Sequence, residues 1–125
     1  MGESLRTMTL EAAADLSAIQ YHFVRLSAVN KTNLASEAAH SSLVGVLINK
    51  PKSGEFGTIG YGGEGKITAG GALTAGDILT TNGSGRAAVV TSGQMAAGRC
   101  LETAGADGDI VRALFFPPVK WFGAP

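Results

Sequence analysis

Short apolar runs alternate with turn-forming residues between Lys66 and Phe116, and this spacing constrains the fold more than any other feature. Gly, Asn, Asp and Ser separate the runs at intervals of roughly 8–12 residues, as in small β domains. None of the runs has the length or the polar spacing of an amphipathic helix. The spacing predicts an all-β unit, a small β-barrel or sandwich. The runs are Ala72-Leu73, Ile78-Leu79, 87–90 and 110–116.

Glycines occur where these runs should turn. Gly76 precedes the run at Ile78, and a tight turn there favours a residue that tolerates a positive φ. The sequence 82–85 (Asn-Gly-Ser-Gly) is the strongest hairpin signal, because primed turns need positive φ at their central residues. The sequence 106–109 (Ala-Asp-Gly-Asp) repeats the device before the last run. We interpret five glycines as structural turn residues: Gly54, Gly76, Gly83, Gly85 and Gly108.

Composition agrees with one small β domain. The 125 residues include 18 glycines and only 6% aromatic residues, a balance that favours short strands and turns over a thick helical interior. Ten basic and ten acidic residues cancel, so we expect neither nucleic acid nor an anionic membrane as a partner. The single Cys100 excludes an internal disulfide, and residues 1–10 lack an apolar signal segment. We therefore expect a protein made in a reducing cytoplasm.

The two ends of the chain differ from the middle. Residues 1–10 are polar, and we expect a flexible N-terminal arm. Residues 11–116 form the expected β domain, beginning with at most a short helix at 11–18. Pro117-Pro118 should end the last strand and leave 117–125 as an aromatic tail.

Three further strands are expected within the domain. Aromatic and β-branched residues indicate a strand at 20–26, and the apolar stretch 43–49 indicates a strand in the middle of the core. A Gly-rich strand follows at 56–61. The polar stretch 29–42 reads as a loop with one short strand around Leu34.

The two halves of the domain are weakly similar. Leu16-Ser17-Ala18 and the strand after it parallel Leu73-Thr74-Ala75 and the strand after that. Val44 to Leu47 likewise parallels Ala97 to Leu101. This favours a two-fold repeat, about 16–61 and 73–116, in which two interlocking β units share one core. Chance similarity between Gly- and Ala-rich strands is the alternative.

Two glycine patterns suggest a phosphate-binding loop but lack its context. Residues 60–65 match G-x-G-x-x-G, and residues 60–66 match G-x-x-x-x-G-K. Ile67 stands where a Mg²⁺-binding Ser or Thr is needed, and the following 68–71 is a poor helix start. We therefore expect Lys66 to be a solvated strand residue and no nucleotide site to exist.

No other side chains form a pattern that performs chemistry. His22, His40 and Cys100 lack the close spacing of metal ligands. No G-x-S-x-G elbow is present, and Asp107 and Asp109 are typical turn residues. We expect no catalytic, cofactor-binding or metal-binding residue, and no enzyme activity.

Several short stretches form a recognisable series when they are taken in order. They are 14–18, 20–24, 44–47, 49–51, 54–55, 73–77 and 85–87. This series, which extends from about Glu11 to Phe116, resembles bacteriophage capsid cement (head decoration) proteins. The resemblance implies a β-barrel of the β-tulip or β-clip kind that binds the outside of a phage head, commonly as a homotrimer, and bridges major capsid protein subunits.

This resemblance, together with the two ends of the chain, suggests contact residues. We expect the arm to contact the capsid, and we expect apolar residues near the C-terminus to contact other subunits of the trimer or to plug an open end of the barrel. The expected capsid contacts are Thr7, Met8, Thr9 and Leu10, and the expected oligomer contacts are Phe115, Phe116, Trp121 and Phe122.

Two other functions compete with a cement role. A carbohydrate- or receptor-binding β module on a virion would need an exposed aromatic platform, for which Trp121 is the candidate. A nucleotide-dependent enzyme would need residues 60–66 to form a phosphate loop.

Overall fold

The computed structural model describes residues 5–35 and 42–121, and these residues form nine strands and no helix. This confirms the predicted all-β class. None of these residues belongs to a helix of the length and apolarity that a membrane crossing requires. The strands are β1 (Arg6–Ala12), β2 (Phe23–Ala28), β3 (Lys31–Leu34), β4 (Leu43–Leu47), β5 (Phe56–Thr68), β6 (Ile78–Thr81), β7 (Ala87–Val89), β8 (Met95–Cys100) and β9 (Ile110–Lys120).

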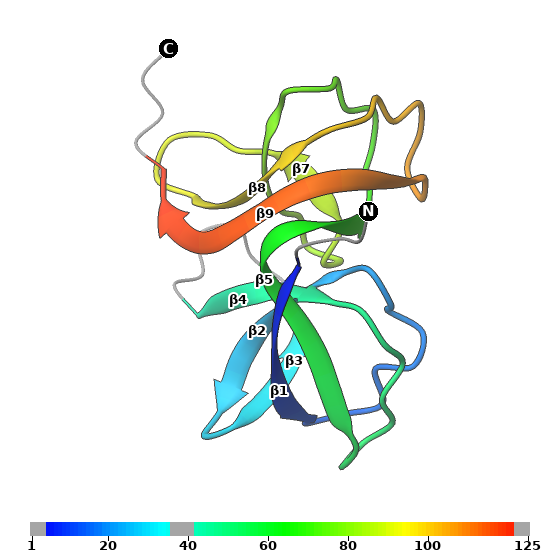
Figure 1. The fold of residues 1–125 in the computed structure, drawn as a ribbon, viewed down its shortest axis with the longest axis vertical. Coiled ribbons are helices and arrows are strands. Elements are labelled where there is room, and N and C mark those ends of the chain that lie inside the picture. Colours follow the sequence, from blue (N-terminus) through cyan, green and yellow to red (C-terminus); the bar gives the residue numbers. More distant parts are fainter. Residues whose placement is uncertain (1–4, 36–41, 122–125) are drawn as a thin grey trace.

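The first five strands close into a barrel, which we call the first unit (lower half of Figure 1). The strand order is β1-β3-β2-β4-β5, and β1 pairs back onto β5. β1 runs parallel to β3, with Ala12 opposite Thr32, and antiparallel to the first half of β5, with Met8 opposite Ile59. Each strand of this unit therefore has a hydrogen-bonded neighbour on both sides.

The second half of β5 continues into a second unit with β9, β8, β6 and β7 (upper half of Figure 1). β5 pairs with β9 from Gly63–Phe115 to Thr68–Ile110. A parallel bridge between Ala69 and Ala87 brings the end of β5 beside β7. The 13-residue strand β5 thus belongs to both units.

The two units repeat the same backbone hydrogen bonds. The Ala12 N–H donates to Glu55 O (2.8 Å), just as the Ala69 N–H donates to Asp109 O (2.7 Å). The Gly54 N–H donates to Ala12 O (3.0 Å), and the Gly108 N–H donates to Ala69 O (2.8 Å). The same strand register places Gly45 opposite Val24 and Gly98 opposite Leu79. A further matching pair joins the Leu16 N–H to Pro51 O (2.9 Å) and the Leu73 N–H to Ala104 O (3.0 Å).

The buried apolar side chains form two clusters. The smaller one fills the first barrel and contains Val24, Leu47 and Ile59. The larger one combines the interior of the second unit with side chains from the outside of the first. At this junction the Phe23 ring meets Phe115 edge to face, with centroids 6.2 Å apart. The outside of the first barrel is therefore packed against the second unit.

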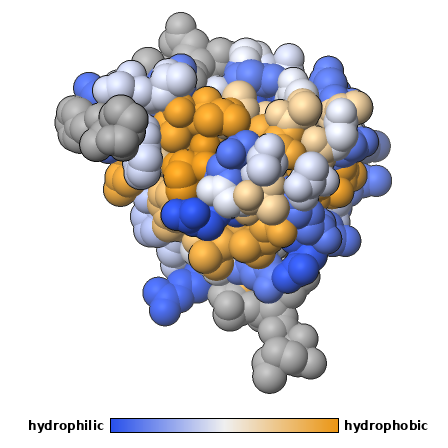
Figure 2. Space-filling view, turned by 90° about the horizontal axis from the view of Figure 1, so that it is seen from above, coloured by the Kyte–Doolittle hydropathy of each residue, from blue (hydrophilic) through white to orange (hydrophobic). Residues whose placement is uncertain are grey.

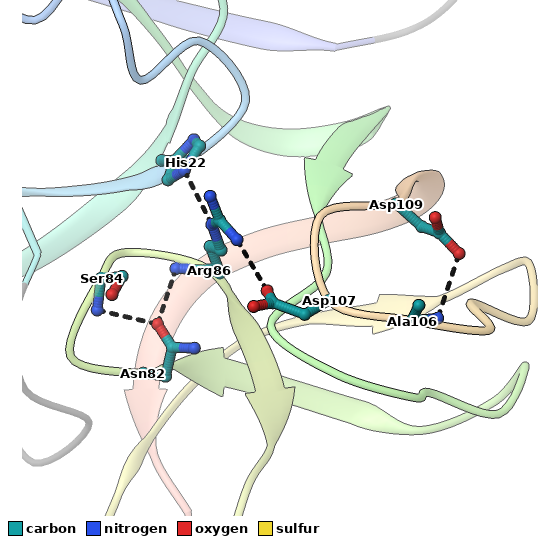
Figure 3. A network of polar contacts seen from close by, with 7 residues as sticks. All are labelled: His22, Asn82, Ser84, Arg86, Ala106, Asp107 and Asp109. Carbon is teal, nitrogen blue, oxygen red and sulfur yellow. Dashed lines mark hydrogen bonds and ion pairs between the residues drawn. The ribbon is translucent and has the colours of Figure 1, made fainter.

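A polar network crosses the same junction (Figure 3). The Arg86 side chain lies between His22 and Asp107: its Nε donates to His22 Nε2 (3.3 Å) and its Nη1 pairs with Asp107 Oδ1 (2.7 Å). The Asn82 carboxamide oxygen accepts hydrogen bonds from the Ser84 and Arg86 backbone and so shapes the hairpin between β6 and β7. Arg86 thus connects loops of the second unit to the start of β2.

The expectation of a flexible arm at the beginning of the chain is wrong. Arg6 to Leu10 belong to strand β1 and are not a flexible arm; only residues 1–4 of that arm lie outside the described residues. The stretch 11–18 contains no helix, because Glu11 and Ala12 complete β1 and Asp15 then caps a turn by accepting hydrogen bonds from the Ser17 backbone and hydroxyl.

The expectation for the end of the chain is also wrong. β9 continues through Pro117-Pro118 to Lys120. The register between β8 and β9 shifts between Ala96 and Gly98, where Gly98 pairs with Phe115 and Ala96 with Val119. This bulge places the prolines where the ladder is already interrupted, so their missing N–H groups do not end the strand.

Candidate protein-docking surface

Equivalent rows of side chains in the two units have opposite environments. In the first unit, Phe23, Val46 and Gly60 lie side by side across β2, β4 and β5. Directly paired residues point to the same side of a sheet, and here that side is covered by the second unit, so Phe23 and Val46 are 0% exposed. This row forms the internal interface of the molecule.

The matching row of the second unit faces outward. Ile78, Arg99 and Leu114 lie side by side across β6, β8 and β9. Ile78 is half-buried, Arg99 is exposed and Leu114 is 44% exposed. No described residue covers this row as the second unit covers the row in the first.

Further aliphatic and cationic side chains extend this row into a surface. Arg112 lies two residues before Leu114 on β9, opposite Lys66 on β5. Its Nε donates to Glu64 Oε2 (2.6 Å), so its charge is partly neutralised. We call the resulting surface the Arg99 face; it comprises Ile78, Arg99, Leu101, Ile110, Arg112 and Leu114.

Apolar side chains are exposed on this half of the molecule. Figure 2, which looks onto the end formed by the second unit, shows a broad hydrophobic patch with hydrophilic side chains set among it. Ile110 is 54% exposed and Leu101 is 37% exposed. Mixed apolar and charged surfaces of this kind are typical of regions that contact other proteins.

A small pocket borders the Arg99 face. Its volume is about 270 Å³, and Tyr21, Lys66, Glu102 and Ile110 are among its lining residues. The Lys66 ammonium lies 6.0 Å from the centroid of the Tyr21 ring. Tyr21 has a positive φ of 64°, which is rare for an aromatic residue, and its backbone joins Leu47 O to the Thr68 N–H. This conformation fixes the aromatic wall of the pocket.

The expected capsid contacts divide between two sides of β1. Met8 and Leu10 pack against the core of the first barrel, whereas Thr7 and Thr9 are exposed on its outer side. Alternation along a strand explains the division. Of the four residues, the two threonines are exposed and Met8 and Leu10 are half-buried.

The expected oligomer contacts are also not one surface. Phe115 is a core residue, because Val111, Ala113 and Phe115 point inward along β9. Phe116 and Trp121 are half-buried, and Trp121 exchanges backbone hydrogen bonds with Gly93 and Gln94. Phe122 lies outside the described residues. The role assigned to Phe115 is therefore wrong, and Trp121 is not a fully exposed platform.

Four of the five expected turn glycines have a positive φ, from 75° to 101°: Gly54, Gly76, Gly85 and Gly108. Gly83 does not, because the hairpin loop is longer than a two-residue primed turn and is shaped by Asn82. At Gly85 an added Cβ would overlap the Leu34 side chain and lie 3.0 Å from Phe23 O. Gly85 thus permits the close approach of the two units.

The patterns that suggested chemistry have structural roles. Residues 60–66 lie inside strand β5, where no helix N-terminus can bind a phosphate. Within the described residues, no three His, Cys, Asp or Glu side chains gather as metal ligands. Burial raises the pKa of the Cys100 thiol, which donates a hydrogen bond to Glu102 O (2.7 Å). His40 lies outside the described residues.

Sequence reasoning missed the residues of the Arg99 face. Ile110, Arg112 and Leu114 alternate with the buried Val111, Ala113 and Phe115, and this period of two is visible in the sequence. The position of Arg99 beside Leu114 depends on the pairing of β8 with β9. The sequence around Arg99 contains no local pattern that predicts this pairing.

Comparisons with known proteins identify a shared fold. No protein-family model and no curated protein matches this chain. Among solved structures, the chain is similar to the head fiber gp8.5 N base in bacteriophage phi29, with a TM-score of 0.66 and 17% identity. The superposition covers 94% of this chain and 99% of that chain. The likeness thus extends over both units of the fold.

Proposed function

We propose that this chain is a structural protein of a phage head that binds the outer surface of the shell and stabilises contacts between major capsid protein subunits. The observation that carries the proposal is the near-complete superposition on a phage head fiber base, over 99% of that chain. The stretches that resemble capsid cement proteins support the same role. We further propose that the chain has no enzyme activity and acts as a homotrimer on the virion.

The fold suggests how such a protein binds. Every strand of the first unit is paired on both sides, so that unit offers no free edge for addition of a strand from the shell. Attachment through the first unit would therefore rely on side chains. Each contact of a trimer can be weak, because the linked subunits raise one another's effective concentration at the shell.

The test is binding of the purified chain to purified phage heads that lack it. We expect saturable co-sedimentation with assembled heads, no stable complex with unassembled major capsid protein, and a trimer mass by light scattering. Heads carrying the chain should withstand heating better than bare heads. Absence of saturable binding to any assembled head would overturn the proposed function.

A further inference from the structure

We propose that the Arg99 face is the surface by which this protein docks onto the head shell, and that its partner is an acidic surface with exposed aliphatic side chains. This inference rests on the proposed function and adds the place and chemistry of contact. The row Phe23–Val46–Gly60 of the first unit is an interface inside the molecule, and Ile78–Arg99–Leu114 is its counterpart in the second unit.

The counterpart keeps the shape of an interface but changes its centre. Ile78 stands in place of Phe23 and Leu114 in place of Gly60, so aliphatic side chains lie on either side of Arg99, which replaces the fully buried Val46. A guanidinium between two aliphatic side chains can be covered only by a surface that supplies a carboxylate or several carbonyl groups to it. The partner must therefore differ from the surface that covers the first row.

A second copy of this chain does not fit that requirement. The surface that covers the first row is the interior of the second unit, with Leu79, Ala97 and Phe115, and it is already occupied by Phe23 of the same chain. That surface is also apolar and offers Arg99 no carboxylate. A second copy therefore cannot cover this row as the second unit covers the first row, and we take the occupant to be a different protein.

The charges of the face define the partner further. Arg99 donates to Gly76 O (3.1 Å) but forms no ion pair with a described residue, and Lys66 contacts the Tyr21 ring without an ion pair in the described part of the chain. Glu64 already pairs with Arg112. Arg99 and Lys66 thus remain for acidic groups of the partner, while Glu102, which lines the pocket beside Lys66, offsets part of the positive charge there.

The experiment compares charge-reversed variants of the full chain in head co-sedimentation. Arg99→Glu and Leu114→Glu should each raise the apparent Kd for heads at least about tenfold, whereas Arg99→Lys should raise it less. Lys50→Glu is the matched control, because it makes the same change of charge on an exposed loop residue of the first unit and should bind like wild type. Raising the NaCl concentration should weaken wild-type binding more than that of Arg99→Glu.

Thermal unfolding and light scattering complete the design. Variants that unfold like wild type and remain the same oligomer but lose head binding support the inference. If Arg99→Glu and Leu114→Glu bind heads as well as wild type, the inference is wrong although the proposed function stands. If they lose the oligomer and keep head binding, the face binds a second copy and the inference is again wrong.

If Leu114→Glu does not fold, Leu114→Ala and Arg99→Ala are used in its place, and each should lower the affinity for heads at least severalfold. If wild type itself does not bind heads, the proposed function fails first.

Discussion

The two units have the same hydrogen-bonded skeleton and opposite surfaces at the same place. The turns at Gly54 and Gly108 are closed by matching backbone bonds, and Leu47 and Cys100 occupy equivalent inward positions. Yet the row centred on Val46 is buried, and the row centred on Arg99 is exposed. The row of the first unit therefore holds the two units together, while the equivalent row of the second unit is left exposed. Variants at equivalent positions test this division.

The largest difference is expected between Phe23→Ala and Ile78→Ala. Phe23 is 0% exposed and packs against Phe115 at the junction, so its truncation should lower the free energy of unfolding by about 3–5 kcal/mol. Ile78 is half-buried at the equivalent position, and its truncation should cost about 1 kcal/mol. Urea unfolding of both variants measures the difference. Equal losses would contradict the division into a packing row and a docking row.

The next pair is Gly45→Ala and Gly98→Ala. A Cβ at Gly45 would overlap the carbonyl oxygen of Gly60, whereas a Cβ at Gly98 would lie 3.0 Å from the equivalent carbonyl of Leu114. Gly45→Ala should therefore destabilise by about 3 kcal/mol and Gly98→Ala by about 1 kcal/mol, the two ends of the range for overpacking. Midpoints of thermal unfolding should rank the variants in this order. The reverse ranking would mean that β4 and β5 separate more easily than β8 and β9.

The turns at Gly54 and Gly108, by contrast, should be destabilised equally by substitution. Gly54 and Gly108 have φ values of 85° and 94°, and neither has a heavy atom closer than 4.0 Å to an added Cβ. Alanine at either position should cost about 1–2 kcal/mol through backbone strain alone. Gly71→Ala is the control, because its site is equally open and its φ is not positive. A clearly larger loss at one turn would show that the repeat does not extend to the turns.

The smallest effect concerns Cys100, the counterpart of Leu47. Burial raises the pKa of its thiol above that of the unfolded chain. The unfolded thiol therefore ionises first as pH rises, and the free energy of unfolding should fall by less than about 1 kcal/mol between pH 7 and pH 9. Cys100→Ala should remove this contribution. A thiol that reacts with iodoacetamide as fast as a free cysteine would contradict its burial.

The sequence predicts the strongly apolar strands better than the strands of mixed or polar composition. Leu43 to Leu47 and Ile110 to Phe116 have the apolar character of core strands, and turn glycines bound them. β1 carries the same signal, since Met8, Leu10 and Ala12 alternate with polar residues, but its polar composition suggested an arm. Its partners are some 20 and 50 residues away, so composition alone does not show that it is paired.

Other features depend on pairing that no local pattern reveals. Pro117 and Pro118 are tolerated because the bulge in the β8–β9 ladder falls opposite them, and the register that creates the bulge is a property of both strands. The inward side of Phe115 follows from alternation, but its contact with Phe23 requires the two units to meet. The exposed Arg99 row is recognisable as a candidate surface only after its buried counterpart is known.

Strand β5 has a mechanical consequence. Its 13 residues are bonded to β1 and β4 in one half and to β9 in the other. The two units are therefore joined by one continuous hydrogen-bonded strand and not by a linker. A force applied to one unit is transmitted to the other along β5.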